Sequence, residues 1–391
     1  MEDSRGAWHP VTLHDRIGWG AGVSEVMTPL DDLVLWVALT LMPGMKPSVY
    51  ERFLEIFPEP LKALGSPPER FRPLSPALAE ACSFRWRDYV PKAREVLDVC
   101  RKNAIKVLNL ADSSYPERLR QIPNPPMVLY SMGQILPRDS LAVSVIGTRS
   151  PSPAGLVVAE RMGRDLAGTG MTVVSGLARG VDSQAHHGAL RAGGRTGAVL
   201  GSGLDVLYPP EMKELFRRVR ECGWVISEYP PGSPPLKWHF LERNRLLSGL
   251  SMGVVVIEAG SRSGALSTVE HAITQGRAVM AVPGSVLNPS AAGTNKLLAE
   301  GAGLVTCARD VLCFLRRETE YVPEFKEGEN SGGQVNLEEG EILRVVGNEV
   351  LSCDEILRRS PFSAGRSRAL LAMLEVKGLL ERLPGGRYAR R

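Results

Sequence analysis

The 391-residue sequence lacks several features that would assign it to common classes of protein. It has only six cysteines, none in a Cys-x-x-Cys pair or beside a histidine at zinc-ligand spacing, which argues against a disulfide framework and a structural zinc site. No charged-then-apolar signal segment opens the chain, and no apolar run is long enough to cross a membrane. We therefore expect a cytoplasmic protein with no metal and no membrane contact.

Motifs of several enzyme classes are also absent. The phosphate-binding signature of P-loop ATPases does not occur, and no serine lies in the Gly-x-Ser-x-Gly elbow of the α/β hydrolases. Segment 201–206 begins like a dinucleotide-binding turn, but Val206 replaces the glycine that such a turn needs for close packing of helix against strand. We therefore expect no cofactor.

Charge is present in nearly balanced amounts. Lys and Arg number 47 against 43 Asp and Glu, and 43% of the residues are hydrophobic, as in an ordinary globular protein. The formal net charge of +4 does not by itself indicate a nucleic-acid partner, because a local basic groove matters more than the total.

The chain is organised around residues 141–179, which contain two short apolar runs separated by a segment of helical period. This pattern predicts two parallel strands joined by a helix. After each run come glycine, a small hydroxyl residue and an arginine, Arg149 in the first case and Arg179 in the second. Ligands of open α/β sheets lie at the carboxyl ends of the strands, so these two loops predict a shared anionic ligand.

Further apolar runs alternate with helical segments as far as about residue 315; they lie at 196–200, 224–227, 253–257, 278–282 and 304–306. The predicted fold class is therefore α/β: a Rossmann-like, doubly wound and mostly parallel sheet of roughly seven strands, over residues 111–317. The proline-rich segment 115–130 is expected to be extended, without a regular element.

Smaller regions flank this domain. Residues 1–28 have no periodicity and are expected to be an extended tail, while 29–110 predict a small all-α domain. Its two short helices around Pro43-Gly44 resemble a helix–hairpin–helix or SAM-like module, which either caps a duplex backbone or serves only in packing. Residues 318–339 form an acidic linker. Residues 340–391 predict a winged helix, whose partner could be DNA or protein.

A basic and aromatic segment at 237–245 indicates binding of a single-stranded nucleic acid. Lys237 and Arg243 can pair with phosphates, and Phe240 offers a face for base stacking. Ser175 and Ser263 lie in glycine-containing loops, where a hydroxyl is more plausible as a phosphate donor than as a nucleophile. For the adjacent His186 and His187 we prefer a hydrogen-bonding role to a metal-binding one, because neighbouring helical residues do not face one ion.

These motifs, in this order, resemble the DNA-processing protein A family (DprA, also called Smf). The matching segments are IGTR at 146–149, SGLARGVDSQAH at 175–186, GSGLDVLYP at 201–209, SEYPPG at 227–232, KWHFLERNR at 237–245, SGALST at 263–268 and AVPGS at 281–285. Two positions depart from the family pattern: Leu241 stands where proline is usual, and Ser267 where an aliphatic residue is common.

The resemblance implies a non-catalytic, homodimeric protein that binds single-stranded DNA in a basic pocket, protects it and loads the RecA recombinase during natural transformation. The expected DNA-binding residues are Arg149, Ser175, Gly176, Arg179, Gly201, Gly203, Lys237, Phe240, Arg243, Asn244, Arg245, Ser263 and Gly264.

A second interpretation is a nucleotide-hydrolysing enzyme that resembles the nucleoside-monophosphate phosphoribohydrolases. Glu270 would assist glycosidic cleavage, and Arg149 would hold the phosphate. The doubled glycine that precedes Gly-Thr in that family is absent here. Release of a free base from AMP would support this interpretation.

Overall fold

The computed structural model describes residues 29–318, 337–347, 349–376, 379–383 and 386–390. They form two compact units. One contains the described residues up to 132 together with 200–207 and 226–243; the other contains 133–199, 208–225 and the described residues from 244 onward. The predicted tail at 1–28 and most of the predicted linker at 318–339 lie outside the described residues.

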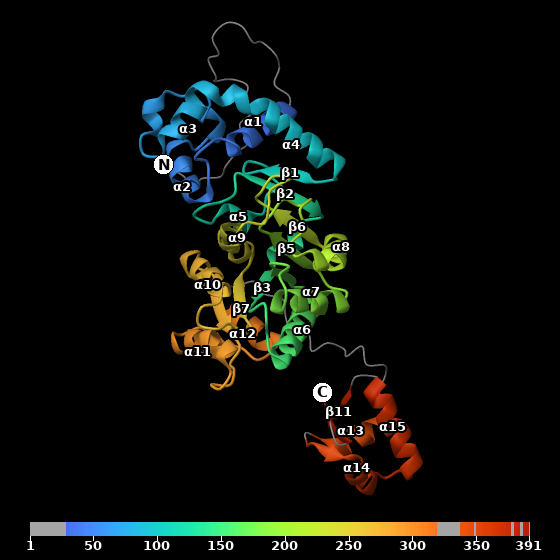
Figure 1. The fold of residues 1–391 in the computed structure, drawn as a ribbon. Helices are drawn as coiled ribbons and strands as arrows, with labels where there is room; N and C mark the ends of the chain where they lie inside the picture. Colours follow the sequence, from blue (N-terminus) through green and yellow to red (C-terminus); the bar gives the residue numbers. More distant parts are fainter. Residues whose placement is uncertain (1–28, 319–336, 348, 377–378, 384–385, 391) are drawn as a thin grey trace, which may run out of the picture. The chain divides into compact units, whose positions relative to one another are not determined.

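One large sheet has the strand order β1-β2-β6-β5-β4-β3-β7-β8-β9 (Figure 1). Its strands are β1 (Lys106–Asn109), β2 (Val128–Gly133), β3 (Ala142–Ile146), β4 (Thr172–Ser175), β5 (Thr196–Leu200), β6 (Trp224–Ser227), β7 (Gly253–Val256), β8 (Ala278–Ala281) and β9 (Gly303–Leu304). The central strand β3 pairs in parallel with β4 and β7, and the parallel pairing continues to β5 on one side and to β8 and β9 on the other. The predicted α/β class with a mostly parallel sheet is confirmed.

The sheet has two strands more than the roughly seven expected. β1 and β2 form an antiparallel pair at one edge, and the expectation that 115–130 holds no regular element was wrong. That segment contains the helical turn α5 (Glu117–Arg120), and β2 begins at Val128. The prolines precede the strand instead of interrupting it, and the carbonyl of Pro126 accepts a hydrogen bond from the Tyr115 hydroxyl at 2.9 Å. The strand β2 is therefore defined by its pairing with β1 in the folded sheet, and not by a pattern in the local sequence.

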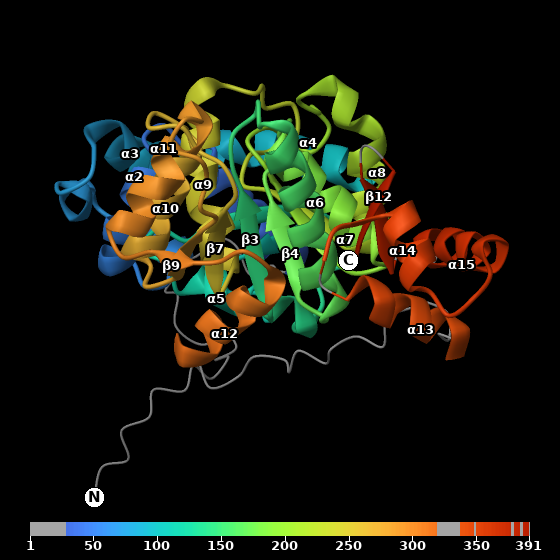
Figure 2. The ribbon, with the colours of Figure 1, turned by 90° about the horizontal axis from the view of Figure 1, so that it is seen from below.

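Helices cover both faces of the parallel strands; they are α6 (Pro153–Gly168), α7 (Val181–Arg191), α8 (Lys213–Cys222), α9 (Lys237–Leu250), α10 (Ala265–Thr274), α11 (Ala292–Ala299) and the unpredicted α12 (Ala308–Glu318). Along β3 the side chains alternate. Val143 and Val145 face α6 and α12, whereas the Ser144 hydroxyl donates to the carbonyl of Leu247 on α9 at 2.9 Å. Figure 2 shows β7, β3 and β4 between α10 on one side and α7 on the other.

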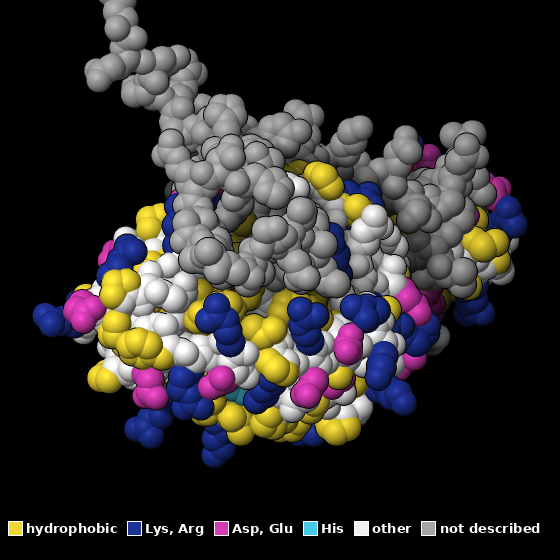
Figure 3. Space-filling model, turned by 90° about the horizontal axis from the view of Figure 1, so that it is seen from above, with side chains coloured by type: hydrophobic (Ala, Val, Ile, Leu, Met, Phe, Trp, Pro, Cys, Tyr) yellow, Lys and Arg dark blue, Asp and Glu magenta, His cyan; other side chains and the backbone are white. Residues whose placement is uncertain are grey.

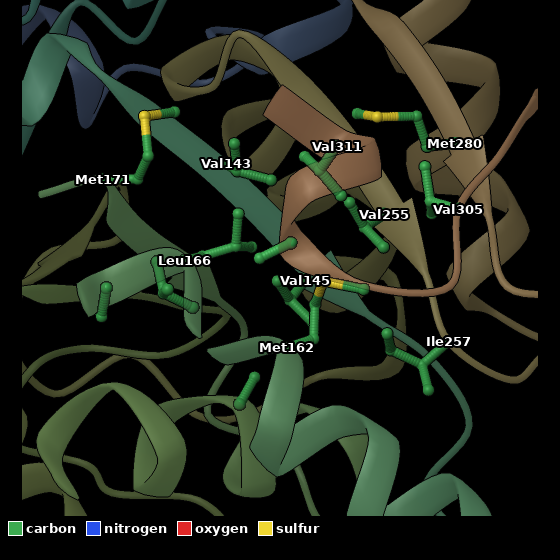
Figure 4. Packing of buried hydrophobic residues seen from close by; sticks show 14 of the residues in the cluster. Val143, Val145, Met162, Leu166, Met171, Val255, Ile257, Met280, Val305 and Val311 are labelled. Carbon is green, nitrogen blue, oxygen red and sulfur yellow. The ribbon is translucent and has the colours of Figure 1, made fainter. Parts of the chain in front are cut away.

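The core beside the sheet is made of aliphatic and methionine side chains from distant parts of the chain. Met162 and Leu166 of α6 pack with Val255 of β7 and Val311 of α12 (Figure 4). Because both faces of these strands are buried, the strands appear in the sequence as continuous apolar runs.

The N-terminal helical region is present, although it ends before the predicted boundary at residue 110, because Lys106–Asn109 form β1 of the large sheet. It contains α1 (Pro29–Thr40), α2 (Pro47–Ile56), α3 (Pro76–Glu80) and α4 (Val90–Lys102), with short helical turns between them. The aromatic rings of Phe53, Phe57 and Phe71 pack inside it, with centroid separations of 5.2 and 4.8 Å along the series. Seen from above, in Figure 3, Lys and Arg side chains lie among acidic and hydrophobic ones, so they form no continuous basic patch on this view of the described surface.

The C-terminal elements form the winged helix. They are α13 (Leu337–Val346), β10 (Leu351–Ser352), α14 (Cys353–Arg359), α15 (Ala364–Val376), β11 (Leu380–Leu383) and β12 (Arg387–Arg390). The predicted three helices and hairpin are present, and the unpredicted β10 completes a three-stranded sheet by pairing with β12. Ile342, Ile356 and Leu374 belong to a separate hydrophobic core. None of the helices among the described residues combines the length and the apolar character needed to span a bilayer.

Candidate functional site

Two arginine-bearing loops touch at the carboxyl ends of β3 and β4. The Val181 amide donates to the carbonyl of Thr148 at 3.3 Å, which ties the loop after β4 to the loop after β3. Gly180 has a φ of +78°, and a Cβ there would lie 2.5 Å from the Thr148 oxygen, so only glycine fits this approach. Arg149 and Arg179 are both exposed on these loops. The structure thus brings together the two loops that carry the arginines singled out by the repeated pattern.

The loop after β4 is held in an unusual conformation. Leu177 is buried and has a φ of +53°, a region that a leucine rarely adopts. The Gly176 amide donates to the Asp182 carboxylate at 3.1 Å, and the Ser175 hydroxyl donates to the Val145 carbonyl at 2.7 Å. Strain of this kind persists where the surroundings impose it. Ser175 and Gly176 therefore shape the loop that presents Arg179, and their direct contact with DNA stays a prediction.

Glu258, which the sequence analysis did not single out, holds the loop after β3 from the other side. Its carboxylate accepts from the Ser152 amide at 2.8 Å and the Ser152 hydroxyl at 2.5 Å, and its carbonyl accepts from the Thr148 amide at 2.7 Å. Ser152 is the N-cap of α6, the position at which many Rossmann-like folds bind a phosphate. Here the chain's own carboxylate occupies it. The signal in the sequence that could have identified Glu258 is its position, as an acidic residue directly after the apolar run at 253–257.

Glu211 lies beside one of the exposed arginines. Its carboxylate forms an ion pair with the Nε of Arg179, although both side chains remain substantially exposed. The hydrogen bond from Arg179 lowers the pKa of Glu211, so the carboxylate is ionised at neutral pH. Any anionic ligand of Arg179 has to compete with this carboxylate. Nothing in the sequence pairs the two residues, because they are 32 positions apart.

The first turn of α9 carries the predicted lysine and phenylalanine. Lys237 is exposed, whereas Phe240 is half-buried against Gly201, where a Cβ would lie only 2.9 Å from the ring. The Arg243 guanidinium lies 6.0 Å from the centre of the same ring, and Arg243 itself is buried. Gly201 is therefore needed for close packing of the phenylalanine.

Gly203 belongs to a compact loop next to this turn. Its amide donates to the Ser233 carbonyl at 3.0 Å, and a Cβ at this position would lie 2.7 Å from the Asp205 carboxylate. The Asp205 carboxylate in turn accepts from the Gly232 amide at 2.8 Å. The amide of Gly203, one of the predicted DNA-binding residues, is thus used within the loop, and a contact of this residue with DNA stays a prediction.

The middle of α9 is connected to the start of α10. The Asn244 side-chain amide donates to the Ser267 hydroxyl at 2.8 Å and to the Gly264 carbonyl at 3.3 Å. Ser267 thus accepts a hydrogen bond that the aliphatic residue common at this position could not accept. The Ser263 hydroxyl accepts from the Ala265 amide at 3.3 Å, and the buried Arg245 offers its carbonyl to Gln275 at 2.9 Å.

Six of the predicted residues fall into two groups. Arg149, Arg179 and Lys237 are exposed cations, whereas Arg243, Asn244 and Arg245 are buried. The exposed group can reach an anionic polymer directly, and the buried group is placed to hold α9 and its neighbours. A direct DNA contact by the buried group stays a prediction.

The histidines and Glu270 have simpler environments. The buried His186 ring shares a hydrogen bond between its Nδ1 and the Thr196 hydroxyl at 2.6 Å, which is the hydrogen-bonding role expected for it. No group of three or more His, Cys, Asp or Glu side chains in the part of the chain that the structure describes could hold a metal ion. Glu270 is exposed on α10.

Comparison with known proteins gives matches over most of the chain. The family model described as DNA recombination-mediator protein A matches residues 106–316, and the model described as DprA winged helix domain matches residues 330–386. The chain is 32% identical over 396 residues to Protein Smf of Synechocystis sp.. That alignment covers 91% of this chain and 98% of the relative. It is 43% identical over 204 residues to the DNA processing protein DprA of Streptococcus pneumoniae, covering 52% of this chain and 72% of the relative. The X-ray structure of DprA from Streptococcus pneumoniae superposes with a TM-score of 0.61 at 34% identity, covering 73% of this chain and 98% of that one.

Proposed function

Because this chain belongs to the DNA recombination-mediator protein A family, we propose that it binds single-stranded DNA without sequence preference and delivers it to the RecA recombinase. Binding protects the strand during DNA uptake and recombination. The chain acts as a homodimer and carries out no chemical step of its own.

The observation that supports this proposal best is the contact between the two arginine-bearing loops. Arg149 and Arg179 are exposed on loops that are hydrogen-bonded to each other at neighbouring strand ends, so one stretch of phosphates can reach both. Guanidinium groups bind phosphate oxygens in a charge-assisted geometry that carries no information on base sequence. Exposed Lys237 provides another cation of the same kind at the start of α9.

Charge reversal tests this proposal. Arg179→Glu and Lys237→Glu are each expected to lower the affinity for an oligothymidylate strand by about tenfold at low salt. The dependence of log affinity on log salt should also become shallower by about 0.7 for each phosphate that the variant no longer neutralises. The measurement is fluorescence anisotropy of a labelled strand at two or more salt concentrations, with duplex DNA as competitor.

Lys92→Glu is the matched control, because Lys92 is an exposed lysine on α4 and lies outside all of these loops. It should bind as the unaltered protein does. A loss of affinity for some base sequences but not others would contradict backbone-led binding. Failure of the unaltered protein to bind single strands at low salt would refute the proposal.

Neutralising Glu211 should have the opposite effect. Glu211→Gln removes the carboxylate that competes with phosphate for Arg179, so affinity for the strand is expected to rise by about twofold to fivefold at low salt. The gain should shrink as salt is added. Glu214→Gln is the control, since Glu214 is also exposed but hydrogen-bonds to Arg217 instead. An equal gain in both variants would mean that only net charge matters.

Delivery to RecA is tested separately. RecA assembly on a strand covered by single-strand-binding protein, followed through RecA's ATP hydrolysis, should start faster when this protein is present. Incubation of AMP with the purified protein should release no free base; its release would instead support the hydrolase interpretation, in which Glu270 assists cleavage and Arg149 holds the phosphate.

A further inference from the structure

An aromatic side chain that the sequence analysis passed over is exposed at the start of α9. Trp238 is 52% exposed, whereas Trp36 and Trp224 are 6% and 2% exposed and belong to the protein core. Leu236 and Leu241 are also exposed on the same short segment. A large ring that is half in water has a free face on which a ligand or a partner can pack, and covering that face is favourable.

Trp238 is held in place by two stacked rings beneath it. The centre of its ring lies 4.0 Å from the centre of the His239 ring and 6.5 Å from that of the Tyr229 ring. The plane of the indole is nearly perpendicular to both of these rings. The Tyr229 and His239 rings are themselves stacked at 3.8 Å. These contacts leave about half of the indole uncovered while they limit its rotation.

The two supporting rings are in turn fixed by hydrogen bonds. The Nδ1 of His239 lies 2.9 Å from the carbonyl of Pro234 and 3.2 Å from that of Gly201, so this nitrogen carries the proton and donates to them. The Tyr229 hydroxyl donates to the Glu242 carboxylate at 3.0 Å. The Trp238 ring is therefore prepositioned, and a ligand that stacks on it loses little entropy in ordering the protein.

We propose that Trp238 is a nucleobase-stacking residue, and that its ligand is a single-stranded nucleic acid with unpaired bases. This inference rests on the proposed function and adds to it a base-stacking residue other than Phe240. The exposed ring directly follows exposed Lys237, so a base and its adjoining phosphate meet complementary groups. In a duplex the faces of the bases are already stacked, so Trp238 discriminates against paired DNA.

The test compares two strands of equal length and charge. One is an oligothymidylate and the other is an abasic strand with the same number of phosphates. Trp238→Ala in the full chain is expected to bind the thymidylate strand about tenfold more weakly and the abasic strand with unchanged affinity. The salt dependence of binding should not change, because no cation is removed. Trp238→Phe should retain most of the affinity for the thymidylate strand.

Leu241→Ala is the matched control, because Leu241 is also 52% exposed and lies on the same helix. It should leave binding to both strands unchanged. Equal losses on the thymidylate and abasic strands, or no loss on either, would overturn the stacking role of Trp238. A change in oligomeric state on Trp238→Ala, measured by light scattering, would also overturn it by placing the ring between copies of the chain. If the unaltered protein binds neither strand, the proposed function itself fails.

Discussion

Replacing Asp139 with alanine is expected to lower the free energy of unfolding by about 3 kcal/mol, because it leaves the largely buried guanidinium of Arg195 without its counter-ion. Asp139 and Arg195 form a two-pronged ion pair at 2.7 and 2.8 Å, with side chains only 4% and 15% exposed. The same carboxylate accepts from the Thr172 hydroxyl at 2.8 Å and from the Leu136 amide at 2.7 Å.

Urea denaturation of the full chain, followed by circular dichroism, measures this loss. Glu221→Ala provides the comparison, since Glu221 pairs with Arg217 at the surface and its loss should cost well under 1 kcal/mol. Equal effects of the two substitutions would show that the buried pair does not stabilise this part of the fold. The ion pair lies outside the strand-end loops, so DNA binding measured well below the melting temperature should be retained.

Replacing Gly188 with alanine is expected to cost about 3 kcal/mol, because helices α6 and α7 cross without room for a methyl group. A Cβ on Gly188 would lie 2.0 Å from the backbone oxygen of Glu160, and one on Gly163 would lie 2.2 Å from that of Ala185. Both neighbours are backbone atoms, so the helices themselves have to separate. Each helix directly follows one of the arginine-bearing loops, so we also expect weaker DNA binding.

Gly168→Ala in the same helix α6 is the control. Nothing lies within 4 Å of the position that its Cβ would take, and its φ is not positive. Alanine there should be neutral or should stabilise by about 0.5–1 kcal/mol, as expected from helix propensity. If Gly188→Ala melts at the same temperature as Gly168→Ala, the close approach of the two helices is not present in solution.

The division of the predicted site into exposed and buried residues changes how its variants are to be interpreted. A substitution at Arg149, Arg179 or Lys237 removes a cation that can reach phosphate, whereas one at Arg243 or Arg245 disturbs the packing of α9. Loss of DNA binding in the second group therefore needs a stability measurement before it is assigned to contact. This distinction cannot be made from the sequence, in which all five residues are simply basic.

The sequence by itself determined the fold class, the repeated arginine-bearing loops and the winged helix. Apolar runs of strand length, punctuated by glycine, are local signals that do not depend on distant partners, and β3, β4 and β7 lie where these signals indicate. The motifs also identify the family, because their residues and spacing can be read directly from the sequence.

Only the tertiary structure decided which side chains contact one another. Glu258 at the N-terminus of α6, Glu211 against Arg179, and the ring stack beneath Trp238 all join residues distant in sequence or separated by a loop. Whether a residue such as Trp238 is buried or exposed likewise depends on what packs over it. β2 was missed for the same reason, since this strand, which directly follows a proline-rich segment, is defined by its pairing with β1. The periodicity of apolar residues predicts the local backbone conformation. Contacts between loops form only when the strands that carry them come together in the sheet.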